Sequence, residues 1–193
     1  MFTDCTRVQT SHLFGGIQSV CLFDHEQIIA VNKEAGTRPE SSEAEASALA
    51  AQIKTWGLEL GFQQVGICDT DLSRHEGHLQ DWLAEGMHGE MAYMERHGAK
   101  RSRPGELVPG TLRVISARMD YLPEQAAPLL EVLGQSDRAT VSRYALGRDY
   151  HKVLRRRLQR LASRVERVAG PFGYRVFVDS APVLEKALAE KAG

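Results

Sequence analysis

The sequence predicts an α/β (α+β) fold, in which a mixed sheet is flanked by helices. Short runs of β-branched and aromatic residues alternate with longer segments whose apolar residues recur at helical spacing. The chain has 193 residues, of which 42% are hydrophobic and 25% charged, a balance that supports a single globular domain with one core. It contains no apolar run of membrane-spanning length and no N-terminal secretory pattern, so we expect a cytoplasmic protein.

The first 47 residues carry weak structural signals. Residues 19–30 are compatible with a hairpin around Asp24 and His25. Residues 33–47 are rich in Glu, Ser and Ala and contain a glycine and a proline, as linkers often do. We therefore expect residues 1–47 to be an N-terminal extension of low order, and residues 48–193 to form the domain.

The next segments read as a helix, a strand and a helix. Apolar residues recur at helical spacing over residues 46–60, and Gly61 then ends the helix: Leu49, Ile53, Trp56 and Leu60. Residues 62–68 form a short strand in which Cys68 is expected to be packed in the core. After a turn, a second helix is anchored by four apolar side chains, Leu72, Leu79, Trp82 and Leu83. A short helix over residues 89–97 should follow, with its Met and Tyr side chains filling core.

Two strands are expected after the basic loop at residues 100–104. Residues 111–121 alternate strictly, which places Ile115 and Ala117 on an inward face and Val114 and Ser116 on the other. Residues 123–136 read as a surface connection. Residues 139–145 are expected to form a further long strand.

The C-terminal third predicts a long helix, a strand and a last helix. The helix runs from the turn at residues 147–151 to about Val168 on an apolar stripe. Residues 174–178 are β-branched and aromatic, which favours a buried strand. Pro182 should occupy the first position of the last helix. Asp179 then lies at a strand-to-helix junction, where it either caps the helix or takes part in ligand chemistry.

Charge is distributed unevenly along the chain. Residues 1–100 hold 7 basic and 15 acidic side chains, whereas residues 101–193 hold 17 and 10. The basic residues gather on the long helix, which indicates either a polyanionic partner or an ordinary solvated face. The three cysteines and the scattered histidines match no metal-ligand spacing, so no metal site is expected from them: Cys5, Cys21, Cys68, His75, His78, His88 and His97.

Four blocks of the sequence, in order, resemble epoxyqueuosine reductases. The blocks are WGLELGFQQVGICDTDL, ERHGAKRSRPGELVPGTLRVISARMDY, VSRYALGRDYHKVLRRRLQRL and FVDSAPVLEKALAEKAG. The resemblance runs from about residue 49 to residue 193. It covers the N-terminal cobalamin-binding part of that family, so we expect a catalytic domain truncated at its C-terminus, before the iron–sulfur module.

The resemblance implies a function and a set of site residues. It implies an oxidoreductase that reduces epoxyqueuosine to queuosine in the tRNA anticodon loop, with cobalamin and two [4Fe–4S] clusters. Asp179 would be the general acid, in a carboxyl whose pKa burial would raise. The cofactor and substrate contacts would come from six residues: Arg101, Arg103, Tyr144, Asp149, Tyr150 and His151. His151 would line the pocket without binding cobalt, and the cluster ligands would lie outside this sequence.

Two other functions stay open from the residues. The chain, which we expect to be a monomer, could be a stand-alone binding module that holds tRNA or a corrinoid without catalysis. It could also be a hydrolase or transferase that pairs Asp179 with a histidine, although it has neither a nucleophile elbow nor a P-loop.

Overall fold

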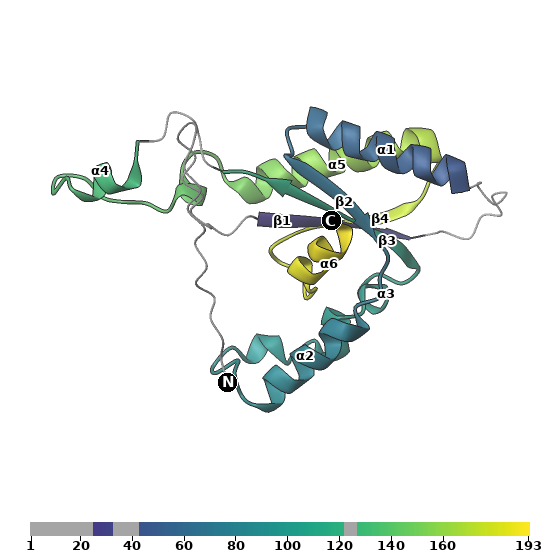
Figure 1. Ribbon diagram of the computed structural model, residues 1–193, viewed down its shortest axis with the longest axis horizontal. Helices are drawn as coiled ribbons and strands as arrows, with labels where there is room; N and C mark the ends of the chain where they lie inside the picture. The colour runs from purple at the N-terminus through teal and green to yellow at the C-terminus, as the bar shows by residue number, and fades with distance from the viewer. Residues whose placement is uncertain (1–24, 33–42, 122–126) are drawn as a thin grey trace, which may run out of the picture.

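A four-stranded sheet lies at the centre of the fold (Figure 1). The protein is described from a computed structural model, which places residues 25–32, 43–121 and 127–193. The strands follow the order β2-β3-β1-β4: β1 (His25–Asn32), β2 (Gln64–Cys68), β3 (Thr111–Met119) and β4 (Gly173–Val178). The α/β class is confirmed. The sequence indicated a mixed sheet, but all three described strand pairings are antiparallel.

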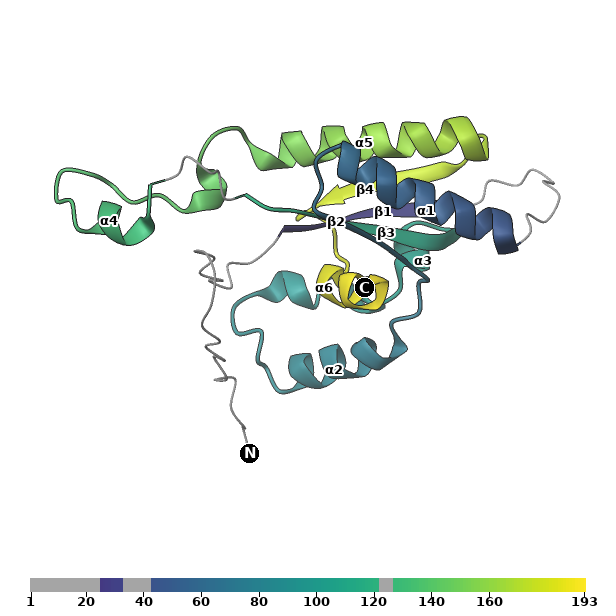
Figure 2. The ribbon, with the colours of Figure 1, turned by 45° about the horizontal axis from the view of Figure 1, so that its top comes forward.

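Helices cover both faces of this sheet (Figure 2). α1 (Glu43–Glu59) and α5 (Tyr150–Ala169) lie on one face. α6 (Glu185–Ala192) packs on the other, with α2 (Ser73–Ala84) beyond it. The remaining elements are single turns: η1 (Ala92–Met94), η2 (Gly98–Arg101), α3 (Pro104–Leu107), α4 (Leu129–Leu133) and η3 (Arg143–Ala145). Within the described residues, no helix is long and apolar enough to cross a membrane.

The sheet separates two hydrophobic clusters. The larger one joins α1 and α5 to the sheet through residues such as Ile53, Leu158 and Val178. The smaller one joins α6 to the opposite face through residues such as Phe177 and Leu188. Successive side chains of a strand point to opposite faces, so the neighbours Phe177 and Val178 enter different clusters.

β3 is buried on both faces. Ile115 and Ala117 pack in the larger cluster, as their alternation predicts. Val114 and Ser116 were expected on an open face, yet they are also buried, at 0% and 6% exposure. The reason is tertiary, because α6 returns at the end of the chain to cover this face.

The expected strand over residues 139–145 is wrong. This segment has no strand, and it ends in the 3₁₀ turn η3. Val141 is half exposed. Strand preference depends on a neighbouring strand and on burial, and this β-branched run has neither.

The expected helix over residues 89–97 is also wrong. Only the three residues of η1 are helical, because the backbone reverses at Gly86, Gly89 and Gly98, all with positive φ. Met91 and Tyr93 are exposed rather than in the core.

The last helix starts later than Pro182. α6 begins at Glu185, after a non-helical segment that follows β4. Val183 already packs in the smaller cluster, and the amide of Leu184 donates to the carbonyl of Arg101 at 2.9 Å. These tertiary contacts hold the segment away from helical geometry.

β1 falls within the range that the sequence indicated as an extension. It pairs with β3 on one side and with β4 on the other, so the sheet begins before the expected boundary at residue 48. The rest of the expected hairpin and residues 33–42 lie outside the described residues.

Candidate active site

Asp179 follows the last residue of β4 in an unusual backbone conformation. It is the only non-glycine residue with positive φ (55°) in the described part of the chain. Aspartate tolerates this left-handed conformation better than most side chains, and such residues are frequent at functional sites. The conformation turns the chain away from the sheet, and the side chain is left 30% exposed.

The N-terminus of α5 carries the second part of the site. Asp149 is the N-cap, and its Oδ1 accepts a hydrogen bond from the amide of His151 at 3.0 Å. The same oxygen lies 3.0 Å from Nδ1 of the His151 ring. The hydrogen bond with His151 lowers the pKa of Asp149 below its ordinary value. Asp149 therefore both starts the helix and orients the imidazole.

The two parts meet at the carboxylate of Asp179. The hydroxyl of Tyr150 donates a hydrogen bond to Asp179 Oδ2, and His151 Nε2 lies 3.6 Å from the same oxygen. The Tyr150 and His151 rings stack with centroids 4.0 Å apart, and Tyr144 meets Tyr150 edge-on at 5.9 Å. Burial, followed by the hydrogen bond to Asp179, raises the pKa of Tyr150. We call these five residues, Tyr144, Asp149, Tyr150, His151 and Asp179, the Asp179 cluster.

Chain topology explains why these distant residues meet. α5 leads through a short turn at residues 170–172 into β4, which packs against it. A helix and a strand joined in this way run in opposite directions, so the start of the helix lies beside the end of the strand. Five of the seven predicted site residues are brought together by this arrangement.

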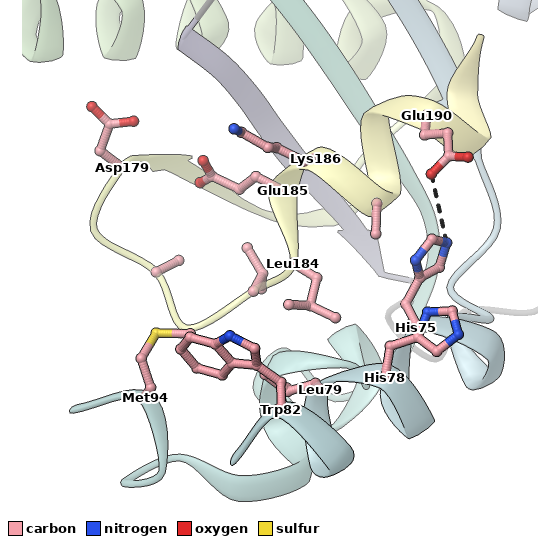
Figure 3. Close-up of a pocket in the computed structure, with 13 residues that line it drawn as sticks. His75, His78, Leu79, Trp82, Met94, Asp179, Leu184, Glu185, Lys186 and Glu190 are labelled. Carbon is pink, nitrogen blue, oxygen red and sulfur yellow. Dashed lines mark ion pairs between the residues drawn. The ribbon is translucent and has the colours of Figure 1, made fainter. Parts of the chain in front are cut away.

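A groove of about 660 Å³ extends from Asp179 between α2 and α6 (Figure 3). Its apolar wall comes from Leu79, Trp82, Met94, Val183 and Leu184. Its polar rim includes His75, which lies 3.8 Å from Glu190 across the groove. Asp179 borders the groove at one end, where Figure 3 shows its carboxyl turned away from the apolar wall.

Arg101 and Arg103 lie apart from this cluster. The Arg101 guanidinium is buried and donates to the carbonyls of Met94 and Tyr93 at 2.9 and 2.6 Å. Arg103 forms an ion pair with Glu76 at 2.7 Å and another with Glu106. Phosphate contact by these arginines stays a prediction, and it would require each guanidinium to leave or share its present partners.

Sequence reasoning missed the contribution of α2 to the groove. His75, His78 and Leu79 all line it, although the sequence indicated Leu79 only as a core anchor. Their spacing of three and four residues does place them on one helix face. The sequence could not show that this face lines a groove instead of packing in the core. In the structure, no α2 residue is fully buried.

The described residues contain no group of three or more His, Cys, Asp or Glu side chains arranged to hold a metal ion. Cys68 is buried, and burial raises the pKa of its thiol. A [4Fe–4S] cluster needs four thiolate ligands, and the whole sequence has three cysteines. The residues of this chain therefore do not fit an iron–sulfur cluster.

Comparison with known proteins shows which sequences this chain is similar to. The family model described as "Epoxyqueuosine reductase QueG, DUF1730" matches residues 101–180. An epoxyqueuosine reductase from Pseudomonas aeruginosa is 67% identical over 145 residues, which are 75% of this chain and 40% of the relative. That from Escherichia coli K12 is 60% identical over 145 residues, 75% of this chain and 38% of the relative.

A solved structure of a protein with the same name as these relatives has a similar fold. The epoxyqueuosine reductase from Streptococcus thermophilus matches with a TM-score of 0.58 and 25% identity, covering 74% of this chain and 38% of that one. The chain belongs to the epoxyqueuosine reductase family, a family of oxidoreductases, and it spans about 40% of the length of these curated relatives.

Proposed function

We propose that this chain is the N-terminal, proton-delivering part of an epoxyqueuosine reductase acting on tRNA in the cytoplasm. The substrate would be an epoxide on the cyclopentane ring of a modified base in the anticodon loop. Two electrons and two protons convert the epoxide into an alkene and water. The two C–O bonds of the epoxide break, and the oxygen leaves with both protons.

One observation carries this proposal: Asp179 borders the groove and contacts Tyr150 and His151 at the same time. A protonated Asp179 would donate to the departing oxygen of a substrate lying in the groove. The Tyr150 hydroxyl fixes the orientation of the carboxyl. The His151 imidazole, close to Asp179 and held by Asp149, is placed to return a proton to Asp179 from solvent.

The groove also suits part of a corrin. Its wall of Leu79, Trp82 and Leu184 matches the apolar face of such a ring, and its polar rim matches amide side chains. Tyr144, Tyr150 and His151 do not line the groove, and we propose that they would contact cobalamin or the substrate where either extends past Asp179. When bound, cobalamin supplies the reducing chemistry, and the protein supplies orientation and the proton.

The test uses a full-length epoxyqueuosine reductase that carries this sequence as its N-terminal part. Asp179→Asn removes the transferable proton but keeps the size of the side chain. We expect the turnover of epoxyqueuosine-containing RNA to fall by about 100-fold or more, the usual contribution of a general acid, with RNA affinity retained. Asp81→Asn is the matched control, because Asp81 lies on an exposed position of α2 outside the groove lining.

Normal turnover in Asp179→Asn would contradict the assigned role. The chain would then be better described as a binding module for tRNA or a corrinoid.

A further inference from the structure

The outer face of α5 is more basic than any other helix surface in the described part of the chain. α5 carries seven basic side chains and a single acidic one, Glu166. Its neighbour on the same side of the sheet, α1, carries three glutamates and one lysine. Exposed helices usually mix charges of both signs, because like charges one turn apart repel. Solubility alone therefore does not account for the composition of α5.

Two of the seven side chains have partners outside α5 and its N-cap. Arg157 donates to the carbonyl of Gly61 at 2.9 Å, and Arg164 pairs with Glu59 of α1. These two arginines join α5 to the α1 side of the fold. The other five we call the α5 basic face: Lys152, Arg155, Arg156, Arg160 and Arg167.

The α5 basic face is open to solvent. All five of its residues are exposed, and the Lys152 side chain is 86% exposed. Among the described residues, no acidic side chain forms an ion pair with Arg155, Arg156 or Arg160. The opposite side of the helix is buried against the sheet through Leu154, Leu158, Leu161 and Val165. Because α5 lies along the outside of the fold (Figure 2), its basic face points away from the body.

The charges form a row. Lys152, Arg156 and Arg160 follow each other at intervals of four residues, about 6 Å apart along the helix axis. Four of the five side chains are arginines, whose planar guanidinium groups suit phosphate oxygens better than lysine does. Such a row of exposed cations is complementary to the phosphates of a nucleic-acid backbone.

The row also leads to the Asp179 cluster. Lys152 follows His151 directly, and its Nζ lies 3.9 Å from Asp149. A polyanion lying along α5 would thus pass beside the carboxyl at the end of the groove. A flexible nucleotide at that point could leave the backbone path and enter the site, as enzymes acting on bases require.

We propose that the α5 basic face binds the RNA phosphate backbone next to the nucleotide that reacts at Asp179. The identity of the polyanion rests on the proposed function, whereas the location of the surface rests on the charges and exposure of α5. Phosphate contacts of this kind position a nucleic acid without reading its sequence.

The experiment measures binding of a fluorescein-labelled tRNA anticodon stem-loop to this chain by anisotropy, between 50 and about 200 mM salt. The test variant is Arg156→Glu with Arg160→Glu. We expect affinity to fall at least about tenfold, and the slope of log K against log salt to become shallower by about 1.5 to 2, since two phosphate contacts are lost. Circular dichroism verifies that the variant is folded.

The control variant is Arg74→Glu with Arg96→Glu, which changes the net charge equally at exposed positions outside α5. It should keep nearly all of the affinity. Equal losses in both variants would overturn the proposal, because they would show only an effect of net charge. Absence of RNA binding by the parent chain would overturn it too, as would binding to vesicles of anionic lipid in place of RNA.

This result is separable from the proposed reaction. If the α5 variant loses RNA while Asp179→Asn keeps full turnover in the full-length enzyme, the surface stands and the catalytic assignment fails. If turnover depends on Asp179 but the α5 variant binds RNA normally, the surface is wrong and the reaction stands.

Discussion

At the scale of single residues, the carboxyl of Asp179 connects the two halves of the site. It borders the groove on one side and accepts a hydrogen bond from Tyr150 on the other. The phenol is harder to ionise here, because its burial and the adjacent carboxylate both disfavour a phenolate. The ionisation of Tyr150 therefore reports whether this contact exists in solution.

We expect Tyr150 to ionise well above its ordinary pKa of 10.0. Absorbance at the phenolate band is followed through alkaline pH for the parent chain and for Tyr150→Phe, and the difference gives the titration of Tyr150. Asp179→Asn should shift this titration down towards the ordinary value, because a neutral amide replaces the carboxylate. Tyr93→Phe is the control, since Tyr93 is 53% exposed. A Tyr150 that titrates at its ordinary pKa would refute the Tyr150–Asp179 contact.

At the scale of elements, α1 approaches β2 closely where one glycine faces the strand. A Cβ added to Gly57 would lie 2.2 Å from Cγ2 of Val65, well inside van der Waals contact. Gly77, in α2, has open space around the same position. Replacing each glycine with alanine therefore distinguishes the effect of packing on stability from the effect of helix propensity.

Gly57→Ala should destabilise the protein by about 1–3 kcal/mol, because overpacking the buried contact with Val65 outweighs the better helix propensity of alanine. Gly77→Ala should stabilise it by up to about 1 kcal/mol, since only propensity changes. Urea denaturation followed by circular dichroism measures both free energies of unfolding. If the two substitutions changed stability in the same direction, the close packing of α1 on β2 would be disproved.

At the scale of the whole molecule, two ionised carboxylates hold distant segments together and a third caps the longest helix. Asp69 pairs with Lys191 of α6, Glu76 of α2 pairs with Arg103, and Asp149 caps α5. The pKa of each is lowered, chiefly by hydrogen bonds from Lys191, Arg103 and His151 respectively. The first two contacts join segments that are far apart in the sequence, whereas the third is local to the start of α5.

Stability should fall in acid for this reason. A carboxyl whose folded pKa lies below its unfolded value stabilises the fold at pH above the unfolded value, and this contribution is lost as pH falls through the folded pKa. The unfolded values here are 3.8 for Asp and 4.5 for Glu. We expect the urea midpoint to decrease progressively as pH falls below about 4.5.

Arg103→Gln provides the comparison, because it removes the main cause of the lowered pKa of Glu76. This variant should be less stable than the parent at neutral pH and should lose less stability on acidification. If the stability of the parent and of the variant depended on pH in the same way, the Glu76–Arg103 pair would not contribute to stability.

The sequence by itself determined the class, the long helix, the strand at β4 and the family. Each of these depends on local periodicity or on a run of matching residues, as with the buried stripe of Leu154, Leu158 and Leu161. It also identified all five members of the Asp179 cluster, through the resemblance of their motifs.

Only the tertiary structure decided the rest. Residues 139–145 have strand propensity but no neighbouring strand, and β1 has two neighbours that are distant in sequence. The sequence places Arg101 in a basic loop, where a solvent-exposed cation is expected. In the structure its guanidinium is buried and donates to two backbone carbonyls. The groove exists because α2 and α6, about 100 residues apart, face each other without closing. Contacts between distant segments set these features, and a local pattern does not encode which partner a segment will find.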